Sequence, residues 1–419
     1  MNEIIRQSII LAVTSLKKHK LRTLLSVLGT SIGIMSLIVI MSAGVSLRAI
    51  FTDQLKAFGN DYIQVEIKIP NTSHTSSENA TGQAQGISVT TLKLKDKESL
   101  DRLPNVRASY AAVIGQGSIS SLYEEKNYNF MAVSSGFFQI DPTGLQSGRS
   151  FGQEEDDSLA KVIVLGSDAA KKLFPNQSAV GQSIKLQKTN FRVIGVMNER
   201  GSSGFVNMDE WSYIPLQTAQ KIVLGYDHLA MILAQLKDIS QDQQTAEEAI
   251  AVLRQNHEIT DPNKDDFAVT TQAEAQAIIG TILDGVTLVL SIIASIALLV
   301  GGVGIMNIMY VAVSERYFEI GLRKAVGARA RHIRSQFLIE AIVVTLFGGI
   351  FGIISAILMI TLLFGVAQAI GFSWPFAISI PSIFVAIIFS SAVGLTFGYF
   401  PARKAATLPP VEALMSRGM

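Results

Sequence analysis

The sequence predicts an α-helical membrane protein with four transmembrane helices and a large α/β extracytoplasmic domain, carrying a β-rich insertion, between helices 1 and 2. Three stretches contain no Asp, Glu, Lys, Arg or His: 23–47, 285–314 and 341–402. A helix needs about 20 mostly apolar residues to cross a bilayer, so the longest stretch fits two helices and each of the others fits one. Mean hydropathy is +0.35, with 48% hydrophobic residues. The segment 48–284 between the first two stretches is too polar to enter lipid.

Residues 1–20 are expected to form a helix lying in the cytoplasmic membrane interface. Apolar residues recur there at helical spacing: Ile5, Ile9, Ala12 and Leu16. A plain extension of the first span is the alternative, but the four charges at 17–22 would interrupt it. A cleaved signal peptide is a second alternative, but its apolar core is usually about 7–15 residues, shorter than the run ending at Leu47. We therefore expect an uncleaved first span at 21–48.

The outer segment, 49–280, is expected to contain an α/β part (52–145 and 228–277) and a β-rich insertion (146–227). Alternating or β-branched runs predict strands at 62–69, 108–114, 129–133, 161–165, 191–196, 229–235 and 267–270, and helical patterns occur at 91–103, 167–174 and 245–255. The tract 71–86 (NTSHTSSENATGQAQG) is polar without periodicity, which predicts a flexible loop or disordered insert. Because the chain has no cysteine, this domain must be stabilised by its own core.

The later spans are expected at 281–313, 335–365 and 378–402. Basic residues cluster before the first span, in the loop 314–334 and in the tail 403–419, whereas the short loop 366–377 has none. The positive-inside rule then places both termini and the 314–334 loop in the cytoplasm of a bacterial cell, with the long segment and the short loop outside.

Small residues recur at four-residue spacing within the spans. They are Gly29 and Gly33 in the first, Gly348 and Gly352 in the third, and Ser390, Gly394 and Gly398 in the fourth. Such residues allow helix backbones to approach closely in lipid. Packing within one subunit explains some of them, and we expect at least one of these faces to meet another subunit.

No catalytic, cofactor-binding or metal-ligating motif stands out. There is no phosphate-binding G-x-x-x-x-G-K-[ST] and no H-E-x-x-H, and the five histidines lack ligand spacing. The GSSG at 201–204 matches a serine-protease tetrapeptide, but no span contains a histidine to act as base. The S-x-x-K at 15–18 lacks the supporting motifs of the enzymes that use it, and we interpret it as a chance match. No span has an ionisable residue in its middle, which argues against an ion-coupled carrier. The energy for transport must therefore come from elsewhere.

The cytoplasmic loop 315–334 is the candidate docking element for an energy source. It reads ERYFEIGLRKAVGARARHIR, predicting a short amphipathic helix that Gly327 ends. The candidate contact residues are Glu315, Arg316, Glu319, Ile320, Leu322, Arg323, Lys324 and Val326. The alternative is that the loop is only a basic anchor that sets topology.

Several motifs carry a resemblance to a known family. The loop motif SERYFEIGLRKAVG at 314–327 is followed by QFLIEA at 336–341, and GYFPARKAA at 398–406 precedes PVEAL at 410–414. The outer segment contains KLFP at 172–175, VGQSI at 180–184 and FRVIGV at 191–196. In these motifs the chain resembles the MacB/FtsX-type (type VII) ABC transporter permeases.

The resemblance implies four spans, a dimer and two bound ATPase subunits, with the helix in 315–331 seated in a groove of the ATPase. ATP and magnesium would bind the ATPase, so the permease itself would be neither an enzyme nor a cofactor protein, and no nucleic acid is implied. In MacB the ATPase is fused ahead of the first span; here about twenty residues precede it, so we expect a separate ATPase chain.

The expected function is export of antimicrobial peptides or other amphiphiles, with a membrane-fusion-type adaptor and by mechanotransmission from ATPase to outer domain. Two alternatives remain open from the sequence. One is FtsX-like regulation of cell-wall hydrolases, and the other is lipoprotein extraction. The long outer segment favours export or extraction.

Overall fold

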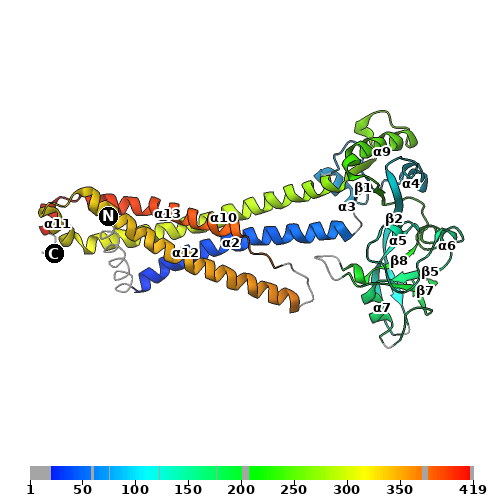
Figure 1. The fold of residues 1–419 in the computed structure, drawn as a ribbon, viewed down its shortest axis with the longest axis horizontal. Helices are drawn as coiled ribbons and strands as arrows, with labels where there is room; N and C mark the ends of the chain where they lie inside the picture. Colours follow the sequence, from blue (N-terminus) through cyan, green and yellow to red (C-terminus); the bar gives the residue numbers. More distant parts are fainter. Residues whose placement is uncertain are drawn as a thin grey trace. The chain divides into compact units, whose positions relative to one another are not determined.

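In a computed structural model the chain divides into two compact units (Figure 1). The structure describes residues 20–57, 61–74, 76–121, 123–175, 177–200, 207–369 and 376–415. One unit comprises Met1–Ala49, Thr281–Ile370 and Trp374–Met419, and the other comprises Ile50–Gly280 and Gly371–Ser373. The predicted interfacial helix up to residue 19, the GSSG at 201–204 and the turn at 371–375 lie outside the described residues.

The first unit, hereafter the membrane unit, is built from long apolar helices. They are α2 (Lys20–Ala57), α10 (Gln272–Glu315), α12 (Ala330–Ala369) and α13 (Ile380–Thr407). Among the described residues, these four contain segments long and apolar enough to cross a membrane, with segment hydropathies of 2.0 to 2.6. The four predicted transmembrane helices are confirmed. All four helices extend beyond the charge-free stretches at one or both ends, because helical hydrogen bonding continues through the polar flanks.

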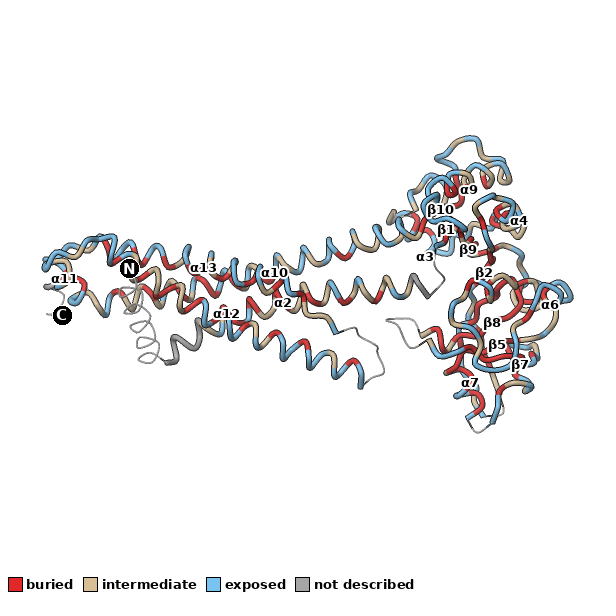
Figure 2. The backbone as a smooth tube through the Cα atoms, viewed as in Figure 1, coloured by how far each residue is buried: buried red, intermediate tan, exposed pale blue. Residues whose placement is uncertain are grey.

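Side chains of the membrane unit divide into a packed interior and an apolar exterior. Figure 2 shows buried and exposed positions alternating along the long helices. The buried Ile34 and Leu298 share a cluster with Ala356 and Val393. The opposite faces of α10, α12 and α13 expose large apolar side chains, such as Val300, Leu358 and Ile388. A soluble protein rarely exposes such an extensive apolar surface to water, whereas in a membrane the lipid tails would surround it favourably.

Two short helices lie at the ends of the long ones. Helix α11 (Tyr317–Ala325) follows α10, and α14 (Pro410–Met415) follows α13. They pack closely, since a Cβ atom added at Gly321 of α11 would lie 2.6 Å from the Cβ of Ala413 in α14. The buried Ile320, Phe337 and Ala405 then join α11 to the ends of α12 and α13 in one apolar cluster.

The second unit, hereafter the outer domain, contains a mixed sheet with short helices around it. In the described part of the chain the sheet has ten strands in the order β10-β1-β9-β2-β3-β8-β5-β7-β4, and β6 pairs with β2 and β7. Strands β3 and β8, and strands β5 and β7, run parallel; the other pairs are antiparallel. The mixed α/β domain expected from the sequence is confirmed, and its α/β and β-rich parts share this one sheet.

The strands are β1 (Tyr62–Ile67), β2 (Val106–Ser120), β3 (Glu125–Val133), β4 (Leu145–Gly148), β5 (Val162–Leu165), β6 (Ser183–Leu186), β7 (Thr189–Met197), β8 (Ser212–Pro215), β9 (Met231–Leu236) and β10 (Phe267–Thr271). The α-helices are α3 (Ser77–Ala84), α4 (Leu94–Leu100), α5 (Phe137–Ile140), α6 (Gln153–Asp157), α7 (Ser167–Leu173), α8 (Leu216–Thr218) and α9 (Asp242–Asn256). A π-helical turn, Ala219–Leu224, extends α8.

Strands β2 and β3 are longer than the expected 108–114 and 129–133. Their added residues form a hairpin in which Gly115 faces Phe130 and Ser120 faces Glu125. A Cβ at Gly115 would lie 2.3 Å from the Phe130 ring, so the glycine makes room for that buried side chain. Residues 115–120 are mostly polar or glycine, so this extension has no hydrophobic pattern that would predict a strand.

The tract 71–86 was expected to be a flexible loop or disordered insert, and this expectation is wrong. It contains α3, whose N-cap Ser76 accepts a hydrogen bond from the Asn79 backbone N–H. The Asn79 side chain is 4% exposed, accepts from the Ile69 N–H at 2.9 Å and donates to the His74 carbonyl at 3.1 Å. Local side-chain to backbone bonds, which have no apolar period, order this segment.

A buried histidine joins three elements of the outer domain. His257, directly after α9, lies between Asp266 before β10 (Nδ1 to Oδ1, 2.7 Å) and Asp96 in α4 (Nε2 to Oδ2, 3.2 Å). Burial alone would lower the His257 pKa, but hydrogen bonds and charges from Asp266 and Asp96 outweigh it and raise this pKa to about 9. The protonated imidazole thus donates to both carboxylates and holds α4 against the sheet edge.

We expect α4 to become less stable as the pH rises. Because the folded-state pKa of His257 lies above the unfolded value of about 6.5, its contribution is complete below pH 6.5 and is lost towards pH 9. The loss is on the order of 3 kcal/mol. Hydrogen–deuterium exchange of residues 94–100 in the full chain, corrected for intrinsic rates, measures it. The substitution His257→Gln should flatten the pH dependence of this exchange. An equal pH dependence in the unaltered chain and in the His257→Gln variant would contradict this account.

Candidate coupling surface and outer-domain pocket

Helix α11 is anchored to the rest of the membrane unit by one face. Ile320 is 4% exposed, and the Arg316 guanidinium lies 3.3 Å from a carboxylate oxygen of Glu340, which is 3% exposed in α12. The Lys324 ammonium donates to the Leu408 carbonyl at 2.7 Å, and burial lowers the pKa of Lys324. These contacts fix the position of α11 at the ends of α10, α12 and α13.

The other face of α11 is an apolar stripe. Phe318, Leu322 and Val326 follow each other at four-residue spacing and are 36%, 50% and 83% exposed. Residues four apart lie on the same side of a helix, so the three form one surface, hereafter the exposed α11 face. Glu319 and Arg323 flank it and pair with each other at 2.5 Å, while Arg323 also donates to Gln336 at 2.9 Å. Glu315 precedes α11 and is exposed.

Four of the eight predicted contact residues fall into two groups. Leu322 and Val326 present apolar surface outwards, whereas Ile320 and Lys324 are held by the chain's own residues. Ile320 therefore belongs to the anchored face of α11, because its side chain is already packed, and the assignment of the eight residues to an ATPase interface stays a prediction. The sequence reasoning missed Phe318 and the contact of α11 with α14. The four-residue spacing of residues 318, 322 and 326 is the signal that could have identified Phe318.

All seven small residues of the spans pack within the chain. A Cβ at Gly29 would lie 3.2 Å from the Gly301 Cα, and one at Gly33 would lie 2.8 Å from the Leu298 Cα, both in α10. Gly348 and Gly352 of α12 face α2 in the same way, with Thr30 and Ile34 opposite. Ser31 of α2 also donates a hydrogen bond to the Gly348 carbonyl at 2.9 Å. Glycine therefore sets the separation of α2 from two neighbouring helices.

The fourth span repeats this arrangement against the third. The Ser390 hydroxyl donates to the Thr345 carbonyl at 3.2 Å, and Cβ atoms at Gly394 and Gly398 would lie 2.5 Å from Thr345 Oγ1 and from Ala341 Cβ. Every predicted small residue thus already contacts a neighbouring helix of its own chain. These contacts account for the small residues within one chain, and the expectation that one of the faces also meets another subunit stays a prediction.

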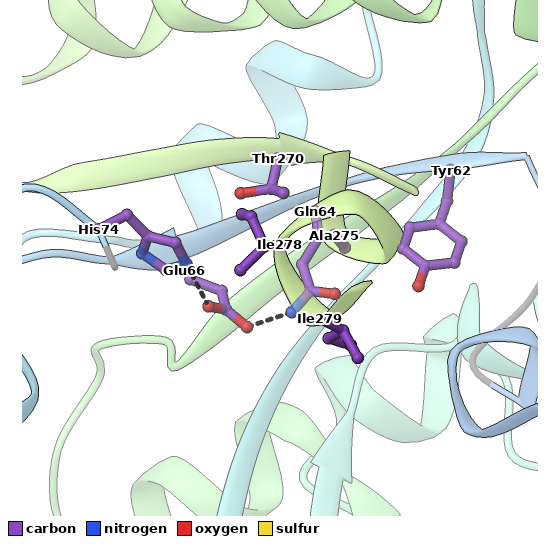
Figure 3. Close-up of a pocket in the computed structure, with 8 residues that line it drawn as sticks. All are labelled: Tyr62, Gln64, Glu66, His74, Thr270, Ala275, Ile278 and Ile279. Carbon is purple, nitrogen blue, oxygen red and sulfur yellow. Dashed lines mark hydrogen bonds and ion pairs between the residues drawn. The ribbon is translucent and has the colours of Figure 1, made fainter. Parts of the chain in front are cut away.

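The outer domain contains a recess of about 230 Å³ that the sequence did not indicate (Figure 3). Its lining consists of Tyr62, Gln64 and Glu66 of β1, His74, Thr270 of β10, and Ala275, Ile278 and Ile279 in the first turns of α10. The three β1 residues alternate along the strand and therefore share one face of the sheet. In the sequence, the alternation at 62–69 predicts a strand, but the polar residues on one face of that strand do not by themselves indicate a pocket.

Charged groups gather at one end of this recess. The Glu66 carboxylate accepts from the Gln64 amide and lies 3.3 Å from His74 Nε2. The hydrogen bond to Glu66 raises the pKa of His74, and burial lowers this pKa by a smaller amount. The negative charges of Glu66 and Glu274 raise the His74 pKa further, whereas the positive charge of Lys68 lowers it. Burial, followed by the Glu66 charge, raises the pKa of Tyr62 to about 12, so its hydroxyl stays protonated.

Two family descriptions match the chain. The MacB-like periplasmic core domain matches residues 23–252, and the FtsX-like permease C-terminal domain matches residues 291–410. The first covers the first span and most of the outer domain, and the second covers the later part of α10, then α11, α12 and α13.

Curated relatives match over nearly the whole chain. A macrolide export ATP-binding/permease protein MacB of Bdellovibrio bacteriovorus is 31% identical over 96% of this chain and 60% of its own length. One of the same name from Chlorobium luteolum is 36% identical over 96% of this chain and 59% of its own length. The chain thus spans about 60% of the length of these relatives. The crystal structure of the periplasmic region of MacB from Actinobacillus actinomycetemcomitans is 18% identical, with a TM-score of 0.45, over 54% of this chain and 95% of that one.

Proposed function

Because this chain belongs to the family of MacB-like, FtsX-like ABC transporter permeases, we propose that it is the permease part of an exporter driven by an ATPase partner. The proposed cargo is an amphiphile, such as an antimicrobial peptide, that the outer domain expels. The relatives carry the name of macrolide exporters, which agrees with an amphiphilic cargo in general. A homodimer with two ATPase subunits and an adaptor protein is the proposed assembly.

The observation that carries this proposal is the division of α11 into an anchored and an exposed face. Ile320 and the Arg316–Glu340 pair fasten the helix to the ends of the spans. A force applied to Leu322 and Val326 would therefore be transmitted to α10 and α12 rather than absorbed by a loose loop. In this proposal α11 lies in the cytoplasm and inserts its exposed face into a groove of the ATPase, as positive charges in 314–334 favour.

A reconstitution experiment tests the proposal. The purified chain should hydrolyse no ATP, because its sequence has no phosphate-binding loop. Added to its partner ATPase in lipid vesicles, it should stimulate hydrolysis and move a fluorescent cationic peptide across or out of the membrane. The control is an ATPase variant without its phosphate-loop lysine, which should support neither activity. ATP hydrolysis that copurifies with the permease alone at constant specific activity would contradict the assignment.

A further inference from the structure

We propose that the recess between β1 and the first turns of α10 binds the cationic head of an amphiphile, with Glu66 as its counter-charge. This inference rests on the proposed function in one respect, namely that the bound cation would be a cargo or a regulator of export. The binding itself follows from the recess alone, and it can be measured without an ATPase.

The recess has the size and wall chemistry for a small apolar group. An apolar cavity of about 150 Å³ is enough to bind benzene in an engineered protein, and this recess measures about 230 Å³. In Figure 3, Ala275, Ile278 and Ile279 come from the helix on one side, and the Tyr62 ring closes one end. A hydrocarbon segment next to the charged group of a ligand would contact these side chains.

The opposite end offers a carboxylate with remaining capacity to bind. The two Glu66 oxygens contact the Gln64 amide and His74 Nε2, and a carboxylate has about four lone-pair sites. The Glu66 side chain is 38% exposed, so a ligand can reach it from the open side of the recess. His74 Nδ1 is buried and has no hydrogen-bond partner among the described residues. The histidine therefore meets Glu66 through one nitrogen only.

The charges around the recess favour a cation over an anion. Glu66 and Glu274 are acidic, Lys68 is basic, Tyr62 stays neutral, and His74 changes its charge with pH. With His74 neutral, these groups carry one net negative charge. With His74 protonated, the charges cancel and Glu66 is already neutralised by the imidazolium.

This arrangement gives cation binding a definite pH dependence. A bound cation and the proton on His74 compete for the same carboxylate, so affinity should rise as the pH rises through the His74 pKa. Since that pKa is raised above its ordinary value, the midpoint of the change should lie above pH 6.5. The substitution His74→Gln should give pH-independent binding at the high-pH affinity, because the amide remains neutral.

Calorimetric titration of the full chain in lipid nanodiscs, with empty nanodiscs as the blank, tests the site. The probes are benzyltrimethylammonium, whose charge does not depend on pH, and its neutral isostere neopentylbenzene. We expect the cation to bind at least 10-fold more tightly than the isostere at pH 8. Glu66→Gln should remove that preference and leave isostere binding unchanged, whereas the exposed Glu98→Gln in α4 should change neither. Ile278→Trp, which fills the recess, should weaken both probes.

The possible outcomes separate this inference from the proposed function. Equal affinity of the two probes for the unaltered chain, or an undiminished cation preference in Glu66→Gln, overturns the cation site. Failure of both probes to bind also overturns the cation site. Cation binding with the expected pH dependence, together with a failure of the chain to stimulate any ATPase, supports the site and refutes the exporter assignment.

Discussion

Replacing Leu322 and Val326 together by aspartate should abolish stimulation of the partner ATPase and export, while the permease remains folded. Both side chains are at least half exposed on α11 and contribute little to the chain's own core. If they anchor α11 in an apolar groove, burying two carboxylates there removes two central contacts of the interface. Truncation of such an anchor typically costs about 2 kcal/mol or more, and each 1.4 kcal/mol is tenfold in affinity. Together the substitutions should weaken ATPase binding by about 100-fold or more.

The measurements are ATPase binding, stimulated hydrolysis and export, which should fall together. Arg323 is a poorer choice for this test because it pairs with Glu319 and Gln336, so reversing its charge also disturbs α11 itself. Ile320→Ala is the contrasting variant: it should destabilise the permease by about 2–5 kcal/mol, because it leaves a cavity in a buried cluster. Full stimulation by the Leu322→Asp/Val326→Asp protein would leave α11 with only its role as a basic topology anchor.

The chain's lack of cysteine allows the position of the exposed α11 face to be tested directly. A single Val326→Cys substitution, at a residue 83% exposed, gives one reactive thiol in the protein. A maleimide that cannot cross the membrane should label it only after cells are permeabilised. Bound ATPase should then slow the labelling. Labelling of intact cells would contradict the cytoplasmic position on which the uncoupling experiment depends.

The second large effect is expected at the glycines between the spans. Gly301→Val should prevent normal assembly of the helices, because a Cβ there lies 2.9 Å from the carbonyl carbon of Gly29 and the nitrogen of Thr30. These are backbone atoms of α2 and cannot rotate away. Overpacking typically costs about 1–3 kcal/mol and more where the backbone must move. We expect a large loss of monodisperse protein and a lower unfolding temperature in detergent.

Matched controls exist on the same helices. Gly285→Val in α10 places its side chain where nothing lies within 4 Å, and Gly365→Leu in α12 does the same. Gly352→Leu, whose Cβ lies 2.9 Å from the Ser31 carbonyl oxygen and from Ile34 Cβ, should behave like Gly301→Val. Equal stability of Gly301→Val and Gly285→Val would show that α2 and α10 are not packed at Gly29.

Several features of this protein follow from local sequence alone. The charge-free stretches predicted the four apolar helices, because crossing a bilayer demands length and hydropathy, and both can be read along the chain. The alternation in 62–69 and the β-branched run at 191–196 predicted β1 and β7 for the same kind of reason. Family membership likewise rests on motifs such as SERYFEIGLRKAVG that are contiguous in sequence.

Other features depend on which residues meet across the fold, and only the tertiary structure decided them. Spacing alone could not show that Gly348 meets Thr30 of the same chain, because a small residue fits any close partner equally well. Ile320 and Leu322 are both apolar members of one short helix, yet contacts with Phe337 and neighbouring residues bury the first and leave the second exposed. The recess at Glu66 joins residues from β1, β10, α10 and the segment that holds His74. Hydropathy and periodicity describe one segment at a time, whereas a packed interface or a pocket is a property of several segments together.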